Sequence, residues 1–194
     1  MSQLKQPDNR MSYIGSPADS HLIIVDVQTR ISKAMNDSAS LLRHCEILLR
    51  AAATLDVTTS ITEQYPKGLG NTEPELQQVC PANVATIEKT SFSCCGAEQF
   101  LQRIAATDKK QIILAGIEAH VCVLQTAMDL IQQGRQVFVV ADAVDSRTAQ
   151  NKNLALSRMQ QAGAIISSTE SVLFEWLRDA KHPHFKTMSA LITS

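Results

Sequence analysis

Two continuous apolar runs, each about the length of one strand, most constrain what this chain can fold into. The runs are HLIIVDV at 21–27 and QIILAG at 111–116. A strand that is apolar on both faces is typical of a parallel sheet covered by helices on both sides. The stretch from 38 to 55 repeats its apolar residues every three to four positions, which predicts an amphipathic helix beside such a sheet.

The rest of the chain continues this alternation of strand and helix. Strands are expected at 57–62, 84–89, 136–142 and 164–167, and helices at 97–105, 121–133 and 148–162. Ser167 and Glu170 can form a capping box for a further helix, and a short docked helix is expected in 182–194. The long segment at 63–76, which contains glycine and proline, reads as a functional loop. The spacing predicts an α/β fold with a parallel sheet and helices on both faces.

Composition narrows the class of protein. The 194 residues are 44% hydrophobic and 19% charged, which predicts one globular domain, placed at 20–194 after a mobile N-terminal arm at 1–19. The net charge of −1 disfavours nucleic acid as a partner, and the apolar runs are too short for a membrane span. Five cysteines without a C-x-x-C motif favour free thiols and a reducing compartment, hence a cytoplasmic protein, with a mitochondrial location left open.

Three chemically distinct side chains lie where parallel strands should end. Asp26 ends the first apolar run, Lys89 ends the strand at 84–89, and Cys122 begins the helix after 111–116. Ligands of such sheets bind outside the carboxyl ends of the strands. Asp26 could take the proton of the thiol while Lys89 balances the charge. Each residue also has an ordinary interpretation: a turn former, a solvated amine and a small buried hydrophobe.

The position of Cys122 at a helix N-terminus predicts a lowered thiol pKa and makes it the preferred nucleophile. Residues near the strand ends are candidates for substrate contact: Gln28, Thr62, Gln64 and Phe92. No glycine-rich turn follows Asp26, so a dinucleotide is disfavoured and no cofactor is expected. His182 and His184 have no third ligand candidate nearby, so no metal is expected either.

Several segments of the chain carry a family resemblance. These are IIVDVQ, EKTSFS and GIEAHVCV in that order, together with TEQYPKGLGNTEPEL and KHPHFKTMSALI. The chain resembles the isochorismatase-like cysteine hydrolase superfamily over about residues 20 to 190, and within it the eukaryotic isochorismatase domain-containing proteins. The segment ITEQYPKGLG has no histidine where the nicotinamidase branch carries metal ligands, which disfavours a metal-assisted nicotinamidase.

The resemblance implies a fold and a mechanism. The fold is a three-layer sandwich whose six-stranded parallel sheet has the strand order 3-2-1-4-5-6. Asp26 would deprotonate Cys122, which would attack a carbonyl carbon and form a thioester, and Lys89 would stabilise the thiolate. The peptide bond Ile117–Glu118 would be cis, and the N–H groups of Glu118 and Cys122 would form the oxyanion hole.

Three functional hypotheses follow. The first is a cofactor-independent cysteine hydrolase that cleaves a small amide or a related acyl compound. The second is an interaction or scaffold protein that keeps the fold without turnover, and the third is a thiol redox protein that pairs Cys122 with Cys94 or Cys95. The expected partners are a small-molecule substrate and other copies of the chain in a dimer or tetramer, with 63–76 and 181–194 as interface segments.

Overall fold

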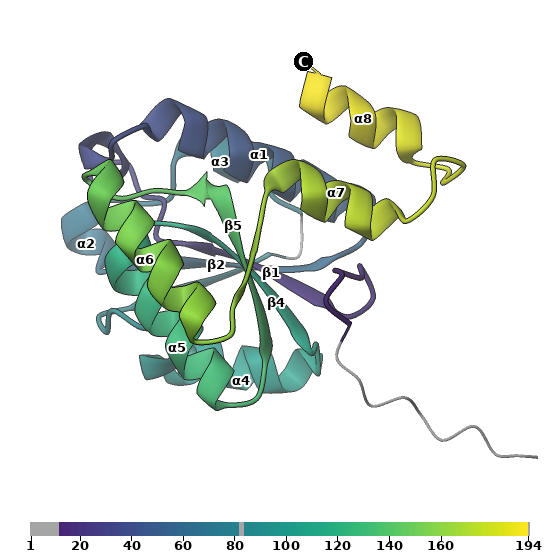
Figure 1. Ribbon diagram of the computed structural model, residues 1–194. Helices are drawn as coiled ribbons and strands as arrows, with labels where there is room; N and C mark the ends of the chain where they lie inside the picture. The colour runs from purple at the N-terminus through teal and green to yellow at the C-terminus, as the bar shows by residue number, and fades with distance from the viewer. Residues whose placement is uncertain (1–11, 82–83, 194) are drawn as a thin grey trace, which may run out of the picture.

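A six-stranded, all-parallel sheet forms the centre of the computed structural model, which describes residues 12–81 and 84–193 (Figure 1). The strands are β1 (Ser20–Val25), β2 (Thr58–Gln64), β3 (Ala85–Lys89), β4 (Gln111–Gly116), β5 (Gln136–Val144) and β6 (Ile165–Ser167). Their order in the sheet is β3-β2-β1-β4-β5-β6, and every pair is parallel. This confirms the predicted fold class and strand order.

Helices cover both faces of the sheet. They are α1 (Ser38–Thr54), α2 (Pro66–Leu69), α3 (Pro74–Val79), α4 (Glu98–Thr107), α5 (Leu124–Gln132), α6 (Ala149–Gln161), α7 (Thr169–Leu177) and α8 (Phe185–Thr193). Helices α1, α3, α7 and α8 pack on one face, and α4, α5 and α6 pack on the other (Figure 1). Within the described residues, no helix is both long and apolar enough to cross a membrane.

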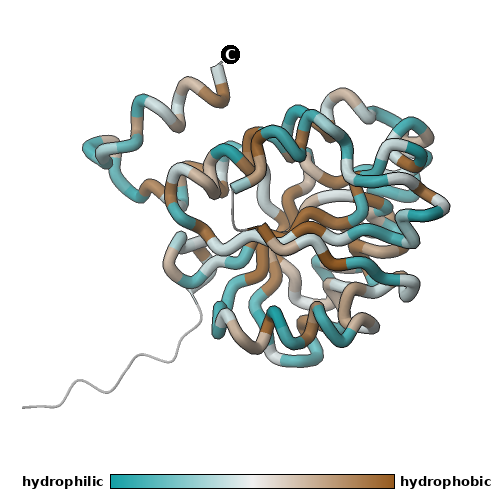
Figure 2. Tube along the Cα trace, turned by 180° about the vertical axis from the view of Figure 1, so that it is seen from behind, coloured by the Kyte–Doolittle hydropathy of each residue, from teal (hydrophilic) through white to brown (hydrophobic). Residues whose placement is uncertain are grey.

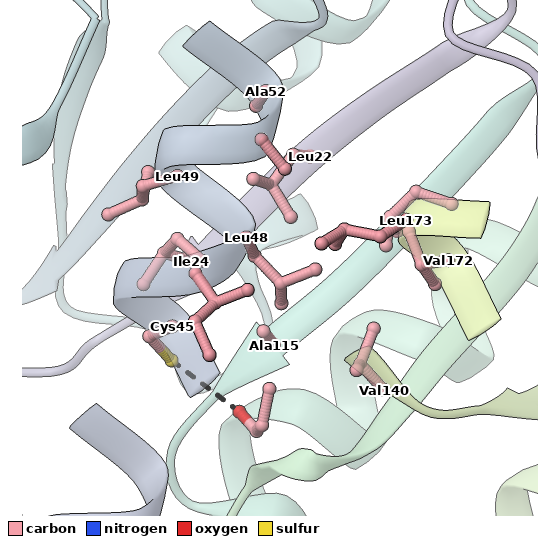
Figure 3. Close-up of a cluster of buried hydrophobic side chains, with 14 of the residues drawn as sticks. Leu22, Ile24, Cys45, Leu48, Leu49, Ala52, Ala115, Val140, Val172 and Leu173 are labelled. Atoms are coloured by element: carbon pink, nitrogen blue, oxygen red, sulfur yellow. Dashed lines mark hydrogen bonds between the residues drawn. The ribbon is translucent and has the colours of Figure 1, made fainter. Parts of the chain in front are cut away.

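The two faces of β1 explain why its sequence is continuously apolar. Leu22 and Ile24 point into the cluster under α1 and α7, whereas Ile23 and Val25 point into the cluster under α4, α5 and α6. All four side chains are fully buried, as the alternation of side chains along a strand requires when both faces are covered. Figure 2 shows the apolar strands inside and the polar helix faces outside, and Figure 3 shows Leu48 of α1 packed over Ile24.

Short segments differ from the sequence expectations. The loop predicted at 63–76 contains α2 and the start of α3, and β2 extends to Gln64. The helix predicted at 121–133 begins earlier, with a π-helical segment at Ala119–Val123 ahead of α5. The cap of α7 is Ser168, whose side chain accepts from the N–H of Ser171, so the capping box predicted at Ser167 was wrong by one residue.

The chain ahead of β1 is tied to the domain where the structure describes it. The N–H of Gly15 donates to Glu175 Oε2 over 2.7 Å, and the N–H of Ser16 donates to Gln111 Oε1 over 2.8 Å. Residues 12–19 of the predicted arm therefore contact α7 and β4. Residues 1–11 of that arm lie outside the described residues.

The strand order reverses between β1 and β4, which places the ligand-binding edge of such a sheet above these two central strands. Gly116 ends β4 with φ of 113°, and a Cβ atom there would overlap the backbone of Val25. Glycine is therefore required for the close approach of β4 to β1. Directly after these two strands come Asp26 and the segment that carries Cys122.

Candidate active site

Asp26 is held rigidly just beyond β1. Its backbone adopts φ of 53°, and its N–H donates to the carbonyl oxygen of Thr62 at the neighbouring strand. Its side chain is 1% exposed. Oδ1 accepts from Thr62 Oγ1 over 2.7 Å, and Oδ2 accepts from Lys89 Nζ over 2.6 Å. The carboxylate therefore points into the protein with both oxygens engaged.

Lys89, the last residue of β3, reaches across the end of β2 to form this ion pair. Its side chain is fully buried, and Nζ has four acceptors within 3.2 Å. The acceptors are Asp26 Oδ2 at 2.6 Å, Gln64 Oε1 at 2.7 Å, and the carbonyl oxygens of Phe92 at 3.1 Å and Ser91 at 3.2 Å. An ammonium group has three hydrogens to donate. Lys89 is therefore saturated and acts as a fixed internal charge.

Cys122 is the third residue of the site and comes from the segment that follows β4. It lies in the π-helical segment Ala119–Val123, where π-helical turns are frequent at functional sites. Its thiol and the Asp26 carboxylate are close enough that each shifts the pKa of the other, and the residue is 5% exposed. The structure thus brings together all three residues that were predicted to meet.

The electrostatics of the thiol differ from the sequence expectation. Burial, and then the negative charge of Asp26, raise the pKa of Cys122 to about 12, although Lys89 acts in the opposite direction. The predicted lowering of this pKa by the helix N-terminus was wrong, because desolvation outweighs the helix dipole at a buried thiol. Burial also raises the pKa of Asp26, against the influence of Lys89 and of its hydrogen bonds. The resting site therefore holds a neutral thiol beside Asp26.

The peptide bond Ile117–Glu118 is cis, as the family resemblance implied. Within the described residues, no hydrogen bond uses the N–H of Glu118. The side chain of Glu118 is held by two hydrogen bonds from Arg147, of 3.0 and 3.1 Å. The N–H of Cys122 belongs to the first turn of the π-helical segment. Both predicted oxyanion donors therefore lie in one short, firmly held stretch of backbone.

The four predicted substrate contacts separate into two kinds. Gln28 is fully buried, and its carboxamide is hydrogen-bonded to the backbone of Gln64, at the end of β2, and of Gly70. Thr62 and Gln64 hold Asp26 and Lys89 respectively. The side chain of Phe92 is 56% exposed at the same edge, while its carbonyl oxygen accepts from Lys89. Of the four, Phe92 presents the most surface to a ligand.

Sequence reasoning missed two parts of the site. The carbonyl oxygens of Ser91 and Phe92 help to hold Lys89, and a backbone group gives no signal in the residue type. Cys94 is fully buried, and its thiol donates to Thr62 Oγ1 over 3.7 Å, directly behind Asp26. Burial raises the pKa of Cys94 to about 12. The adjacent pair Cys94 and Cys95 signalled a thiol in this loop without indicating its place.

A cavity of about 560 Å³ opens beside the ion pair, between α2 and the start of α4. Tyr65, Lys89 and Ser91 are among the residues that line it, whereas Cys122 lies outside the lining. The cavity is large enough for a small molecule. Over residues 12–81 and 84–193, no three potential ligand side chains are grouped so that they could hold a metal ion. All five cysteines are free thiols.

Proteins of known sequence and structure resemble the chain over most of its length. Isochorismatase domain-containing protein 2 of Danio rerio is 38% identical over 177 residues, which cover 91% of this chain and 88% of that protein. The MAR1 ribonuclease of Caenorhabditis elegans matches with a TM-score of 0.89 and 36% identity, over 93% of each chain.

Two bacterial YcaC structures match with TM-scores of 0.85. The protein from Pseudomonas aeruginosa is 25% identical, covers 95% of this chain and 98% of its own, and carries a covalent acrylamide. The protein from Escherichia coli is 26% identical, covers 95% of this chain and 97% of its own, and is described as an octameric hydrolase of unknown specificity.

The fold and the site together define a parallel α/β domain with a buried carboxylate, ammonium and thiol at the carboxyl edge of its sheet. The sequence model of the isochorismatase domain matches residues 20–171. The chain therefore belongs to the isochorismatase family, with the eukaryotic isochorismatase domain-containing proteins among its relatives. The fold of this family is a hydrolase fold.

Proposed function

We propose that this protein is a cofactor-independent cysteine hydrolase that cleaves a small amide, or a related acyl compound, through a thioester. The observation that carries this proposal is the convergence of Cys122, Asp26 and Lys89 in one buried site. A thiol whose pKa is about 12 reacts poorly unless a base removes its proton during the attack. Asp26 is the base that lies near that thiol.

The proposed reaction balances with the residues present. Asp26 takes the proton of Cys122 as the sulfur attacks the carbonyl carbon, and the C–N bond breaks as Asp26 returns that proton to the leaving amine. A water molecule then attacks the thioester and gives one proton to Asp26. The acid is released, and the proton returns to the sulfur of Cys122.

Lys89 supports these steps as a fixed positive charge. Its ammonium remains beside Asp26 throughout, so the carboxylate form is compensated each time the proton leaves. The oxyanion would form near the N–H groups of Glu118 and Cys122. Each such donor typically contributes about 2.7–4 kcal/mol of transition-state stabilisation. The covalent acrylamide on the related Pseudomonas protein supports a reactive nucleophile in this structural group.

The test is a screen of small amides, esters and thioesters, with the Cys122→Ala variant as the negative control. We expect turnover by the wild type and its loss by a factor of at least about 10³ in Cys122→Ala, because the covalent route is removed. Cys80→Ala is the matched control, since Cys80 is half-buried at the end of α3, away from the site. Full turnover by Cys122→Ala would contradict the proposal, whereas an inactive wild type would favour the scaffold hypothesis.

Ribonuclease activity is a second candidate, favoured by the 36% identity to the MAR1 ribonuclease. The same screen therefore includes short single-stranded and duplex RNA. Cleavage of RNA that persists in Cys122→Ala would assign that activity to other residues and would leave Cys122 without a role in it. The net charge of −1 argues against an extended phosphate-binding surface.

We propose that residues 20–194 act as one domain, that the protein works in the cytoplasm, and that it assembles with copies of itself. The octameric state of the Escherichia coli relative supports assembly.

A further inference from the structure

Gln64 lies between the ion pair and the loop that follows β3. Its Oε1 accepts from Lys89 Nζ over 2.7 Å, and its Nε2 donates to the carbonyl oxygen of Thr90 over 2.7 Å. The two partners define which way the carboxamide faces. A reversed amide would set its NH₂ group against the ammonium and its oxygen against a carbonyl oxygen.

Gln28, in the loop after β1, fixes the backbone of Gln64 by hydrogen bonds. Its Oε1 accepts from the Gln64 N–H over 2.7 Å, and its Nε2 donates to the Gln64 carbonyl oxygen over 3.0 Å and to that of Gly70 over 2.5 Å. Gln28 is fully buried. The loop after β1 thus holds the backbone of Gln64, while Lys89 and Thr90 hold its carboxamide.

We infer that Gln64 is a positioning residue of the site, which directs the Lys89 ammonium onto Asp26 and so governs proton transfer from Cys122. The inference rests on the proposed function and deepens it. Among the four acceptors around Nζ, Asp26 and Gln64 are the nearest, and the carbonyl oxygens of Ser91 and Phe92 are about half an ångström farther. Without the Gln64 oxygen, the ammonium is drawn toward these two carbonyl oxygens and away from Asp26.

The consequence is a change in the reactivity of Cys122. When Lys89 compensates Asp26 less well, the pKa of Asp26 rises, and a larger fraction of Asp26 is already protonated and cannot accept the thiol proton. The negative charge that forms as Cys122 loses its proton is also less well compensated. A change of one pKa unit corresponds to about a tenfold change in the reactive fraction. Gln64 thus acts through Lys89 and Asp26 on a sulfur atom that it does not contact.

The experiment measures alkylation of Cys122 by iodoacetamide between pH 5 and 9, by mass spectrometry of the peptide that contains it. Gln64→Glu should react like the wild type at low pH, where a protonated carboxyl group still accepts from Lys89 and donates to Thr90. At higher pH the ionised Glu competes with Asp26 for Lys89, and the rate should fall about tenfold through a new titration step. Gln64→Met should react more slowly at every pH, without that step.

Gln77→Glu is the matched control, because Gln77 also donates to a backbone carbonyl oxygen, that of Thr72, but lies outside the ion pair. It should follow the wild-type profile, and circular dichroism should show all three variants folded. A wild-type profile in Gln64→Glu, or an equal change in Gln77→Glu, would overturn the inference. A dependence on Gln64 together with full turnover by Cys122→Ala would refute the proposed function and leave the inference standing.

Discussion

Lys89 and Asp26 form an ion pair that is almost completely buried, which affects how the site can be tested by substitution. Removal of one partner leaves an uncompensated charge inside the protein, and such changes cost about 3–5 kcal/mol. Asp26→Asn and Lys89→Met therefore change stability as well as activity. Cys122→Ala keeps the ion pair intact and is the cleaner probe of chemistry.

The burial of His21 makes the stability of the protein depend on pH. It is fully buried in β1, between Ser60 Oγ at 2.9 Å and Thr107 Oγ1 at 3.3 Å. Burial, and then the nearby positive charges of Arg103, Lys109 and Arg135, lower its pKa from 6.5 to about 3. Between these two pH values the unfolded chain binds one more proton than the folded chain, so stability must fall as the pH falls.

We expect the titration of His21 to lower the unfolding free energy by about 2 kcal/mol as the pH falls from 7 to 5. Urea denaturation at both pH values measures this loss, and His21→Gln is the comparison because glutamine does not titrate. The difference between the two proteins isolates His21 from every other titrating group. Equal losses in the wild type and in His21→Gln would show that His21 is not responsible.

Among the elements, the strands could be predicted because a strand buried on both faces leaves a continuous apolar run. The segment 111–116 was predicted at the bounds that the structure gives to β4. Helices α2 and α3 could not be predicted in this way, because they are short and lie in a segment rich in glycine and proline. The π-helical start before α5 was also missed, since its residues fit the same apolar pattern as an ordinary helix.

The site was partly predictable for a related reason. Asp26 and Lys89 stand out because a charged residue ends a strand, and Cys122 because a thiol begins a helix. Gln28 was expected to contact substrate, yet it is fully buried and hydrogen-bonded to the backbone of Gln64 and Gly70. Burial decides whether a side chain such as Gln28 holds backbone or faces a ligand, and it also decides the direction of the pKa shift of Cys122. The burial of one side chain depends on contacts between segments that are distant in the sequence.

Gly116 tests the contact between the two central strands. Gly116→Ala should lower the unfolding free energy by about 3 kcal/mol or more, because its φ of 113° is unfavourable for alanine and the added Cβ would overlap the backbone of Val25. Gly134→Ala is the control. Its φ is also positive, at 77°, but the space around it is open, so its cost should be about 1–2 kcal/mol. Equal costs in urea denaturation would contradict a steric requirement at Gly116.

The exposed apolar residues decide which surface is available for assembly. The tail at 181–194 was expected to be an interface segment, but Phe185 and Leu191 are partly buried against the cluster under α1 and α7. In the loop at 63–76, Tyr65 is 55% exposed. The N–H of Tyr65 donates to the carbonyl oxygen of Lys89. The Nζ of Lys89 in turn donates to the carbonyl oxygen of Phe92, whose side chain is also exposed. The backbones that carry both aromatic side chains are thus anchored to Lys89.

We expect the protein to be larger than its 21.2 kDa monomer in solution, and we expect the edge beside Lys89 to take part in the contact. Exposed aromatic residues on a rigid backbone are typical of interface centres. The double variant Tyr65→Lys and Phe92→Lys should therefore shift the mass toward the monomer in sedimentation velocity, because a charge in an apolar contact must be desolvated. Leu154→Lys on α6 is the control, since Leu154 is equally exposed, at 57%, on a different face. A monomeric wild type would refute the assembly, and dissociation by Leu154→Lys alone would place the contact on α6.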